Sequence, residues 1–406
     1  MPTPPKTPLK KAHRRVLVAI GTGYGYGRDM IAGVVSYARV HGPWEFVGQT
    51  GPVIRPAAIT RSPQYDGVIF QAMEDGFAEA ARRRGAPAVS VGGRFPAAPD
   101  IPHVTADGEA VARMAFDYLR GLGFNQFATY GGHTALRDTR IGGFMALAKA
   151  AGCQCTDLGP GSPHQPVSTH EDTLWTREIR RLKGKLSTLT GRVALFAWSS
   201  REARPVIAAC DELGLPVPDR IAVMGVDDDE AVCELASPPI TAIDHGCETM
   251  GWQAAQTLDA LMQGRPAETH VARVDPVRVV ERQSTQTLAI DQPVVVAAIN
   301  FIKASFAEGI TVQDVLDEVD CSRPTLEKHF RHAMGQTVRE YITKLKIGHA
   351  QELLQLTTLD HRAISVRCGF SYPSKFSTAF RRETGLSPSD YRRLRRARGG
   401  TLQIPM

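Results

Sequence analysis

CSRPTLEKHFRHAMG (residues 321–335) and SYPSKFSTAFRRETG (residues 371–385) are two copies of one pattern. Their shared positions lie 50 residues apart, because Leu326, Phe330 and Gly335 recur as Phe376, Phe380 and Gly385. A constant offset of this kind indicates an internal repeat. Each copy opens with a serine that can cap a helix, Ser322 or Ser371, followed by a proline that the first helical turn tolerates.

Another helix is predicted directly before each copy. Val315 and Val319 recur 49 residues later as Ile364 and Cys368. The turn between the two helices therefore has one extra residue in the second copy. The apolar spacing predicts helices over residues 312–319 and 323–332 in the first copy, and 362–368 and 373–383 in the second. A long helix over 338–354 joins them. Two helix-turn-helix units are therefore predicted.

The second helix of a helix-turn-helix unit enters the DNA major groove, where exposed side chains meet base edges. With the apolar positions turned inward, the side chains predicted to face bases are Arg323, Thr325, Glu327, Lys328, Ser374, Lys375, Ser377 and Thr378. The basic side chains better placed for phosphates are Arg331, Lys344, Lys346, Arg381, Arg382, Arg392 and Arg393. An ordinary helical bundle with a solvated basic surface is the alternative.

The distribution of charge agrees with this interpretation. The net charge is +6, and residues 290–400 contain 17 Lys and Arg against 12 Asp and Glu. The rest of the chain is nearly neutral. A basic, compact C-terminal unit is typical of proteins that bind nucleic acid.

Length and composition set the class of the whole chain. A chain of 406 residues predicts two or three domains, and 43% hydrophobic with 22% charged residues is typical of soluble globular protein. The sequence shows neither a membrane-spanning run nor a secretory signal. Seven scattered cysteines favour reduced thiols over a disulfide framework, so we expect a cytoplasmic protein.

Short β-branched runs alternate with amphipathic stretches through the first two thirds of the chain, which predicts βα units on parallel sheets. The candidate strands are Val16–Ile20, Gly67–Phe70, Ala88–Val91, Gln126–Tyr130, Val193–Ala197 and Ile221–Val226, with helices at Gly108–Gly121 and Gly142–Gly152. The predicted organisation is a basic tail over 1–13, an α/β domain over 14–289, an all-α domain over 290–396 and a tail over 397–406.

The α/β part carries few enzyme signatures. The glycine-rich run 21–28 fails the dinucleotide spacing, which favours a ligand-facing loop that presents Tyr26 and Arg28. Cys153 and Cys155, with His164 and His170 downstream, form a possible zinc cluster. Two cysteines at this spacing with remote histidines are more often incidental, so we expect neither a metal nor a cofactor. The carboxylates of residues 227–230 suit either acid–base chemistry or binding of sugar hydroxyls, and the second is favoured.

The C-terminal motifs resemble the DNA-binding domain of the AraC family. The resemblance rests on residues 364–372 (ISVRCGFSY), on Phe376 and Phe380, and on residues 385–392 (GLSPSDYR), with a weaker match over 321–330. It implies that the two recognition helices enter successive major grooves. Pro324 and Pro373 stand where other members often place a base-reading side chain.

Residues 14–285 resemble the effector domain of the LacI family. The matching motifs, in order, are 104–107, 121–123, 140–144, 214–218, 222–228 and 238–241. The resemblance implies a periplasmic-binding-protein-like fold with two α/β lobes and a sugar between them. By position, it implies that Asp107, Arg140 and Asp227 bind hydroxyls and that Trp175 stacks on the sugar. Trp198 is a further candidate, and it precedes Ser199-Ser200 where the family has Asn-Asp.

The two resemblances on one chain imply a transcription regulator that responds to a sugar and is not an enzyme. A pentose, with D-xylose as the leading candidate, is the implied effector, and activation is favoured over repression. The implied partners are a double-stranded DNA operator and a second copy of the chain, with RNA polymerase as a further candidate and no membrane. The alternatives are an enzyme acting on a sugar or nucleotide, with a helical interaction module, and a DNA binder that needs no ligand.

Overall fold

The computed structural model describes residues 13–48, 51–93, 98–132, 138–161, 171–287 and 292–398. It divides into two compact units. The first contains residues up to Thr105 together with Cys247–Arg273, and the second contains Ala106–Gly246 and everything from Val274 onward. The chain thus passes between the units three times.

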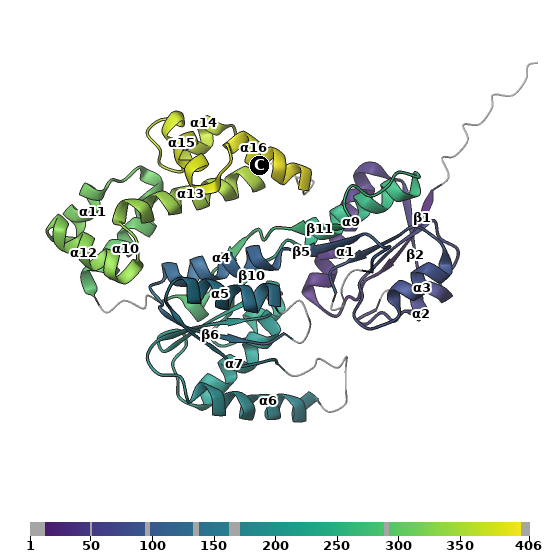
Figure 1. Cartoon of the computed structure of the whole chain (residues 1–406), viewed down its shortest axis with the longest axis horizontal. Helices are drawn as coiled ribbons and strands as arrows, with labels where there is room; N and C mark the ends of the chain where they lie inside the picture. Colours follow the sequence, from purple (N-terminus) through teal and green to yellow (C-terminus); the bar gives the residue numbers. More distant parts are fainter. Residues whose placement is uncertain are drawn as a thin grey trace, which may run out of the picture. The chain divides into compact units, whose positions relative to one another are not determined.

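The first unit is a six-stranded sheet with helices on both faces (Figure 1). The strand order is β11-β5-β4-β3-β1-β2, and the pairs from β2 through β5 are parallel. Its strands are Arg14–Ala19 (β1), Trp44–Val47 (β2), Gly67–Phe70 (β3), Ala88–Val91 (β4), His103–Ala106 (β5) and Val271–Val274 (β11). Helices Ala57–Arg61 (α2) and Phe77–Arg84 (α3) pack on one face, and Gly25–His41 (α1) and Cys247–Met262 (α9) form a tight pair.

The second unit contains the other sheet, of order β12-β10-β9-β8-β6-β7, in which only the β10–β12 pair is antiparallel. Its strands are Gln126–Tyr130 (β6), Gln154–Asp157 (β7), Val193–Ala197 (β8), Ile221–Val226 (β9), Thr241–Asp244 (β10) and Arg278–Val280 (β12). Gly108–Gly121 (α4) and Gly143–Ala150 (α5) cover one face, and Glu171–Leu186 (α6) and Ser200–Glu212 (α7) the other. Both faces are buried, as parallel strands require.

Described residues 292–398 are helical and form two small cores that share one helix. The helices are Pro293–Ser305 (α10), Val312–Val319 (α11), Arg323–Met334 (α12), Val338–Leu356 (α13), His361–Arg367 (α14), Pro373–Thr384 (α15) and Pro388–Arg398 (α16). The first core combines α10, α11, α12 and the start of α13. The second combines the end of α13 with α14, α15 and α16.

The structure confirms the predicted fold class, and five of the six predicted strands have the expected ends. The first strand begins and ends slightly earlier than predicted. Ser322 caps α12 by accepting a hydrogen bond from the N–H of Thr325, whereas the expected cap by Ser371 is wrong, because Tyr372 occupies that position without a side-chain cap. The expected boundary near residue 290, and most of both tails, lie outside the described residues.

Two helical glycines allow α1 and α9 to pack closely. A Cβ atom on Gly33 of α1 would overlap the carbonyl oxygen of Glu248, and one on Gly251 of α9 would overlap that of Met30. The backbones of the two helices are therefore in direct contact. Each position needs glycine because the main chain of the facing helix leaves no room for a side chain, and not because of an unusual backbone conformation.

Substituting Gly251→Ala should lower the free energy of unfolding by about 1–3 kcal/mol, because the helices must move apart to admit a methyl group. The matched control is Gly184→Ala on α6, where an added Cβ meets nothing within 4 Å. That variant should be neutral or slightly stabilising. Urea unfolding of both proteins measures the difference, and equal midpoints would contradict the close packing.

Candidate functional site

Arg140 is the centre of a buried polar cluster in the second unit. It lies in a π-helical turn, Asp138–Gly142, directly before α5. Only 7% of the residue is exposed, and its guanidinium donates a hydrogen bond of 2.7 Å to the carbonyl oxygen of Trp198. The guanidinium carbon also lies 4.3 Å from the centre of the Trp198 ring, within range of a cation–π contact. Turns of this kind are frequent at functional sites.

Asp227 follows β9 at the same edge of the sheet, and its Oδ1 lies 4.0 Å from the Arg140 guanidinium. Asp227 and Asp228 both have positive φ angles, 88° and 43°. Two successive aspartates in this region store backbone strain of the kind that accumulates at ligand sites. Burial raises the pKa of Asp227 to about 6, although Arg140 opposes the shift.

His245, which follows β10, completes this group, and sequence reasoning did not identify it. Its Nδ1 lies 3.3 Å from Oδ1 of Asp227. Burial, together with the positive charge of Arg140, lowers the pKa of His245 to about 3. The imidazole is therefore neutral at physiological pH. A single histidine outside any motif gave no signal in the sequence.

Glu202 is the second residue that sequence reasoning missed. Its carboxylate accepts hydrogen bonds from the N–H of Gly132 (3.1 Å) and the hydroxyl of Ser199 (3.3 Å). A Cβ on Gly131 or on Gly161 would lie 2.7 or 2.6 Å from the same carboxylate. One acid thus bonds to the segments after β6 and β8 and lies close to the segment after β7. Burial is the main cause that raises the pKa of Glu202 to about 7.

Two other predicted ligand residues of the second unit, Asp107 and Trp175, lie outside this cluster. Asp107 caps α4 by accepting a hydrogen bond from the N–H of Ala110. Trp175 lies on α6 with 38% of its surface exposed, and the guanidinium of Arg204 lies 5.3 Å from its ring centre. The structure therefore brings Arg140, Trp198 and Asp227 together and places Trp175 against α7.

Tyr26 and Arg28 belong to the first unit. They lie in the first turn of α1, which begins at Gly25, and not in a loop as predicted. Tyr26 stacks on Tyr24, and Arg28 donates to the carbonyl oxygen of Thr22. Three glycines of this run are explained by packing. A Cβ on Gly27 would overlap the carbonyl oxygen of Gly21, and one on Gly21 or Gly23 would lie 2.9 or 2.8 Å from the carbonyl oxygen of Pro52.

Neither a metal centre nor a membrane span is found in the part of the chain that the structure describes. No group of three or more His, Cys, Asp or Glu side chains there could hold a metal ion. Cys153 and Cys155 are free thiols, and His164 and His170, the other members of the zinc alternative, lie outside the described residues. Among the described helices, none has the length and apolar character needed to cross a membrane.

The predicted recognition helices α12 and α15 present their polar faces to solvent. Leu326, Phe330, Phe376 and Phe380 are fully buried, as the repeat predicts. Glu327 is partly buried, and the other side chains predicted to face bases are exposed: Arg323, Thr325, Lys328, Ser374, Lys375, Ser377 and Thr378. Tyr372, which was not predicted, adds an aromatic ring at the start of α15 that is 61% exposed.

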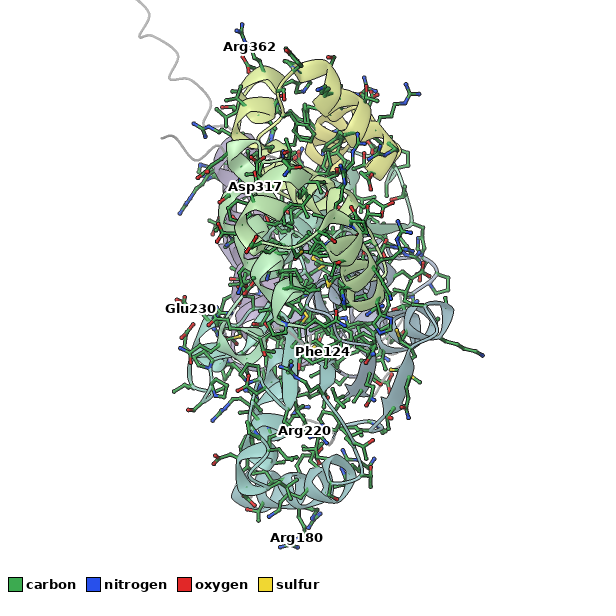
Figure 2. All side chains as sticks on the ribbon, turned by 90° about the vertical axis from the view of Figure 1, so that its left-hand side faces the viewer. Phe124, Arg180, Arg220, Glu230, Asp317 and Arg362 are labelled. Carbon is green, nitrogen blue, oxygen red and sulfur yellow. The ribbon has the colours of Figure 1, made fainter. Side chains whose placement is uncertain are left out.

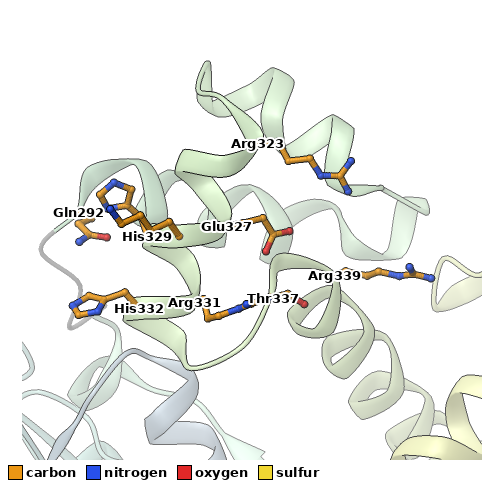
Figure 3. A pocket seen from close by; sticks show the side chains of 9 residues that line it. Gln292, Arg323, Glu327, His329, Arg331, His332, Thr337 and Arg339 are labelled. Atoms are coloured by element: carbon orange, nitrogen blue, oxygen red, sulfur yellow. The ribbon is translucent and has the colours of Figure 1, made fainter.

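A concave region of about 900 Å³ lies beside α12 (Figure 3). Its lining is mainly basic and comes from α12, the start of α13 and the residue before α10: Arg323, Glu327, Lys328, His329, Arg331, His332, Thr337, Arg339 and Gln292. Positive charge in a concave surface attracts a polyanion.

Two of the basic side chains predicted to contact phosphates have other roles. Arg392 donates to the carbonyl oxygens of Leu354 and Leu359, so it holds the end of α13 to α16. Lys346 is only 7% exposed and donates to the carbonyl oxygen of Gly369. Arg331, Arg381 and Arg382 are exposed on α12 and α15. Helix periodicity cannot reveal the turn that covers Lys346.

Comparison with known proteins gives two family matches in the same order. Residues 116–285 match the family described as a periplasmic binding protein-like domain, and residues 315–394 match a helix-turn-helix domain. The Xylose operon regulatory protein of Escherichia coli K12 is 29% identical over 388 residues, which cover 94% of this chain and 97% of that protein. This chain is a sugar-responsive transcription regulator with an AraC-type DNA-binding domain.

Two further relatives match the regulator over nearly its full length. The Xylose operon regulatory protein of Haemophilus influenzae is 26% identical over 95% of this chain and 99% of that protein. The solved structure of the xylose-binding transcription activator XylR has a TM-score of 0.59 and 27% identity, and the match covers 95% of this chain and 99% of that one.

The pH dependence of stability should reveal the buried acid of the regulator. Because the pKa of Glu202 is raised to about 7 in the folded protein, the folded state loses stability as pH rises from about 4.5 to 7. Glu202→Gln does not ionise and should escape this loss. Between pH 5 and pH 8, the free energy of unfolding of the native protein should therefore fall by about 2–3 kcal/mol relative to the variant.

Denaturant titrations at several pH values test this expectation. The control is Glu212→Gln, at the exposed end of the same helix, whose pH profile should follow that of the native protein. Parallel profiles for the native protein and Glu202→Gln would show that Glu202 does not titrate in this range.

Proposed function

We propose that the regulator binds D-xylose and activates transcription in response. The polar cluster of Arg140, Asp227, Trp198 and His245 is the observation that carries the proposal. It joins hydrogen-bonding groups of both signs to an aromatic ring, a combination that suits a sugar's hydroxyls and its apolar ring face. Xylose is named in the relatives described above, and activation in the one whose structure is solved.

In this proposal Arg140 and Asp227 bind sugar hydroxyls, and Trp198 packs against the ring. Asp107 and Trp175 of the second unit, and Tyr26 and Arg28 of the first, are further proposed ligand contacts. Sugar binding shifts the equilibrium between two states of the protein by the difference between its affinities for them. The protein functions in this proposal as a homodimer in the cytoplasm, engages RNA polymerase, and catalyses no reaction.

For DNA we propose that α12 and α15 enter successive major grooves. In this proposal Arg323, Lys328 and Lys375 donate to base acceptors, and Glu327 accepts from cytosine. Thr325, Ser374 and Thr378 lie beside them on the same exposed faces. Arg331, Arg381 and Arg382 neutralise phosphates and position the domain without reading sequence.

D-Xylose should raise the thermal stability of the purified protein. At a concentration 100 times its dissociation constant, a ligand stabilises the folded state by about 2.7 kcal/mol. Asp227→Asn should abolish the shift by weakening the binding of hydroxyls, and DNA binding without sugar should persist. Thermal denaturation with D-xylose, L-arabinose, D-ribose and D-glucose measures the selectivity.

The control is Glu230→Gln, three residues along the chain, whose side chain lies at the surface (Figure 2). It should keep the full response to D-xylose. A shift with another sugar alone would replace xylose as the effector, and no shift with any sugar would overturn the sugar proposal. Release of a modified sugar during incubation would favour an enzyme instead.

Two arginine variants should separate sequence reading from phosphate binding. Arg323→Ala should cost about 1–3 kcal/mol on a preferred duplex and less on random duplexes, which relaxes sequence preference. Arg382→Ala should weaken binding to all duplexes alike and reduce the dependence of log affinity on log salt by about one unit. Fluorescence anisotropy at several salt concentrations distinguishes them, and identical behaviour would contradict the assignment.

A further inference from the structure

The two helix-turn-helix units have separate cores and share one helix. The first core ends with Val338, Tyr341 and Ile342 of α13, and the second begins with Ile347 on the same helix. Gly348 lies near this junction, and a Cβ there would meet nothing within 4 Å. A helix that contains an unsupported glycine bends readily, so α13 alone would leave the angle between the units soft.

A second connection joins the turns of the two helix-turn-helix units. The turn Phe306–Glu308 (η3), which joins α10 to α11, contacts both α13 and α14. Gly369, in the turn between α14 and α15, has a φ of 69° and faces this segment directly. A Cβ on Gly369 would lie 2.5 Å from the carbonyl oxygen of Phe306 and 2.7 Å from the nitrogen of Gly309. The main chains of the two turns therefore touch.

Lys346 ties this contact to α13. Its Nζ donates a 2.8 Å hydrogen bond to the carbonyl oxygen of Gly369 and lies 5.6 Å from the centre of the Phe370 ring. Burial lowers the pKa of Lys346. A charged amine is costly to bury unless it is bonded, so the bond to Gly369 is strongly preferred over an open arrangement. On the same helix, the ring of His349 packs edge-on against Phe306, with 5.7 Å between ring centres.

We propose that Lys346, through Gly369, fixes the angle between the two helix-turn-helix units and thereby the base-pair spacing that the domain accepts between its two half-sites. Lys346 is a positioning residue, since it acts through the turn rather than by touching DNA. The inference depends on the proposed entry of α12 and α15 into successive grooves. B-DNA repeats about every 10–10.5 base pairs, or 34–36 Å. One inserted base pair therefore moves the second half-site by about 3.4 Å and rotates it by about 35°.

The experiment uses the full-length protein and a duplex that it selects from random-sequence DNA. Derivatives of this duplex carry one or two base pairs inserted between the two halves, and affinities are measured by fluorescence anisotropy. With either inserted duplex, the native protein should lose at least about tenfold in affinity relative to the original duplex, because the base contacts of one helix are lost. Lys346→Met should bind the original duplex more weakly and reduce the penalty of an insertion to about threefold or less.

Conservative and matched variants separate positioning from general damage. Lys346→Arg, which can keep a hydrogen bond to Gly369, should restore strict spacing. Lys344→Met removes an exposed lysine from the same helix and should keep the native ratio between the spaced and original duplexes, whatever its effect on affinity. His349→Ala removes the contact with Phe306 from a partly exposed position, and it should relax spacing even if Lys346→Met fails to fold.

The outcomes are distinct. If the native protein shows no spacing dependence, binding of the two helices in successive grooves is wrong. If the native protein shows it, and folded Lys346→Met keeps the full tenfold penalty, the inferred role of Lys346 is overturned. Should Lys346→Met fail to fold, an unchanged penalty in His349→Ala would overturn the inference that the contact between the two turns and α13 fixes the spacing.

Discussion

Burying a guanidinium group removes it from water, and only close polar partners can offset the cost. Arg140 is buried in the second unit, so the segments around it must supply such partners. Residues that follow two strands, β8 and β9, contact it. The carbonyl group of Trp198 accepts its hydrogen bond, and Asp227 approaches in a strained backbone conformation that an unneeded aspartate would not hold. Glu202 then holds the surrounding loops at the same edge. The cluster is thus preorganised, and a ligand that binds there meets groups already oriented without the cost of ordering them.

The sequence was sufficient for the fold because its signals are local and agree with one another. Strands such as Ile221–Val226 are short apolar runs bounded by turn residues, and a strand buried on both faces needs nothing more. The centre of the candidate site could be predicted in part, since Arg140 and Asp227 lie in the motifs that resemble the LacI family. Glu202 and His245 could not, because each is a single polar residue whose importance arises only when distant loops meet.

The helical domain shows the same limit in its basic residues. Periodicity separates the inward Phe376 and Phe380 from the exposed Ser374 and Lys375, since the core of each unit lies on one side of its helix. It fails for Lys346 and Arg392, which look like surface cations in the sequence. Each donates to main-chain carbonyl groups of another segment, and those contacts depend on turns that helix spacing does not describe. These two cations therefore hold segments of the domain together, whereas the exposed ones are those that we propose contact DNA.

The contact between Gly33 and Glu248 joins segments that the ribosome makes far apart in time. The first lobe is interrupted by the 141 residues from Ala106 to Gly246, and it receives α9 only after they have been synthesised. At about 5–20 residues per second this takes roughly 7–30 s. During that interval the nascent first unit exposes the apolar surface that α9 will cover. The sheet of the second unit is also incomplete, because its last strand, β12, has not been synthesised. The sheets of both units are then completed within the same few seconds, and the helices of residues 293–398 emerge after them.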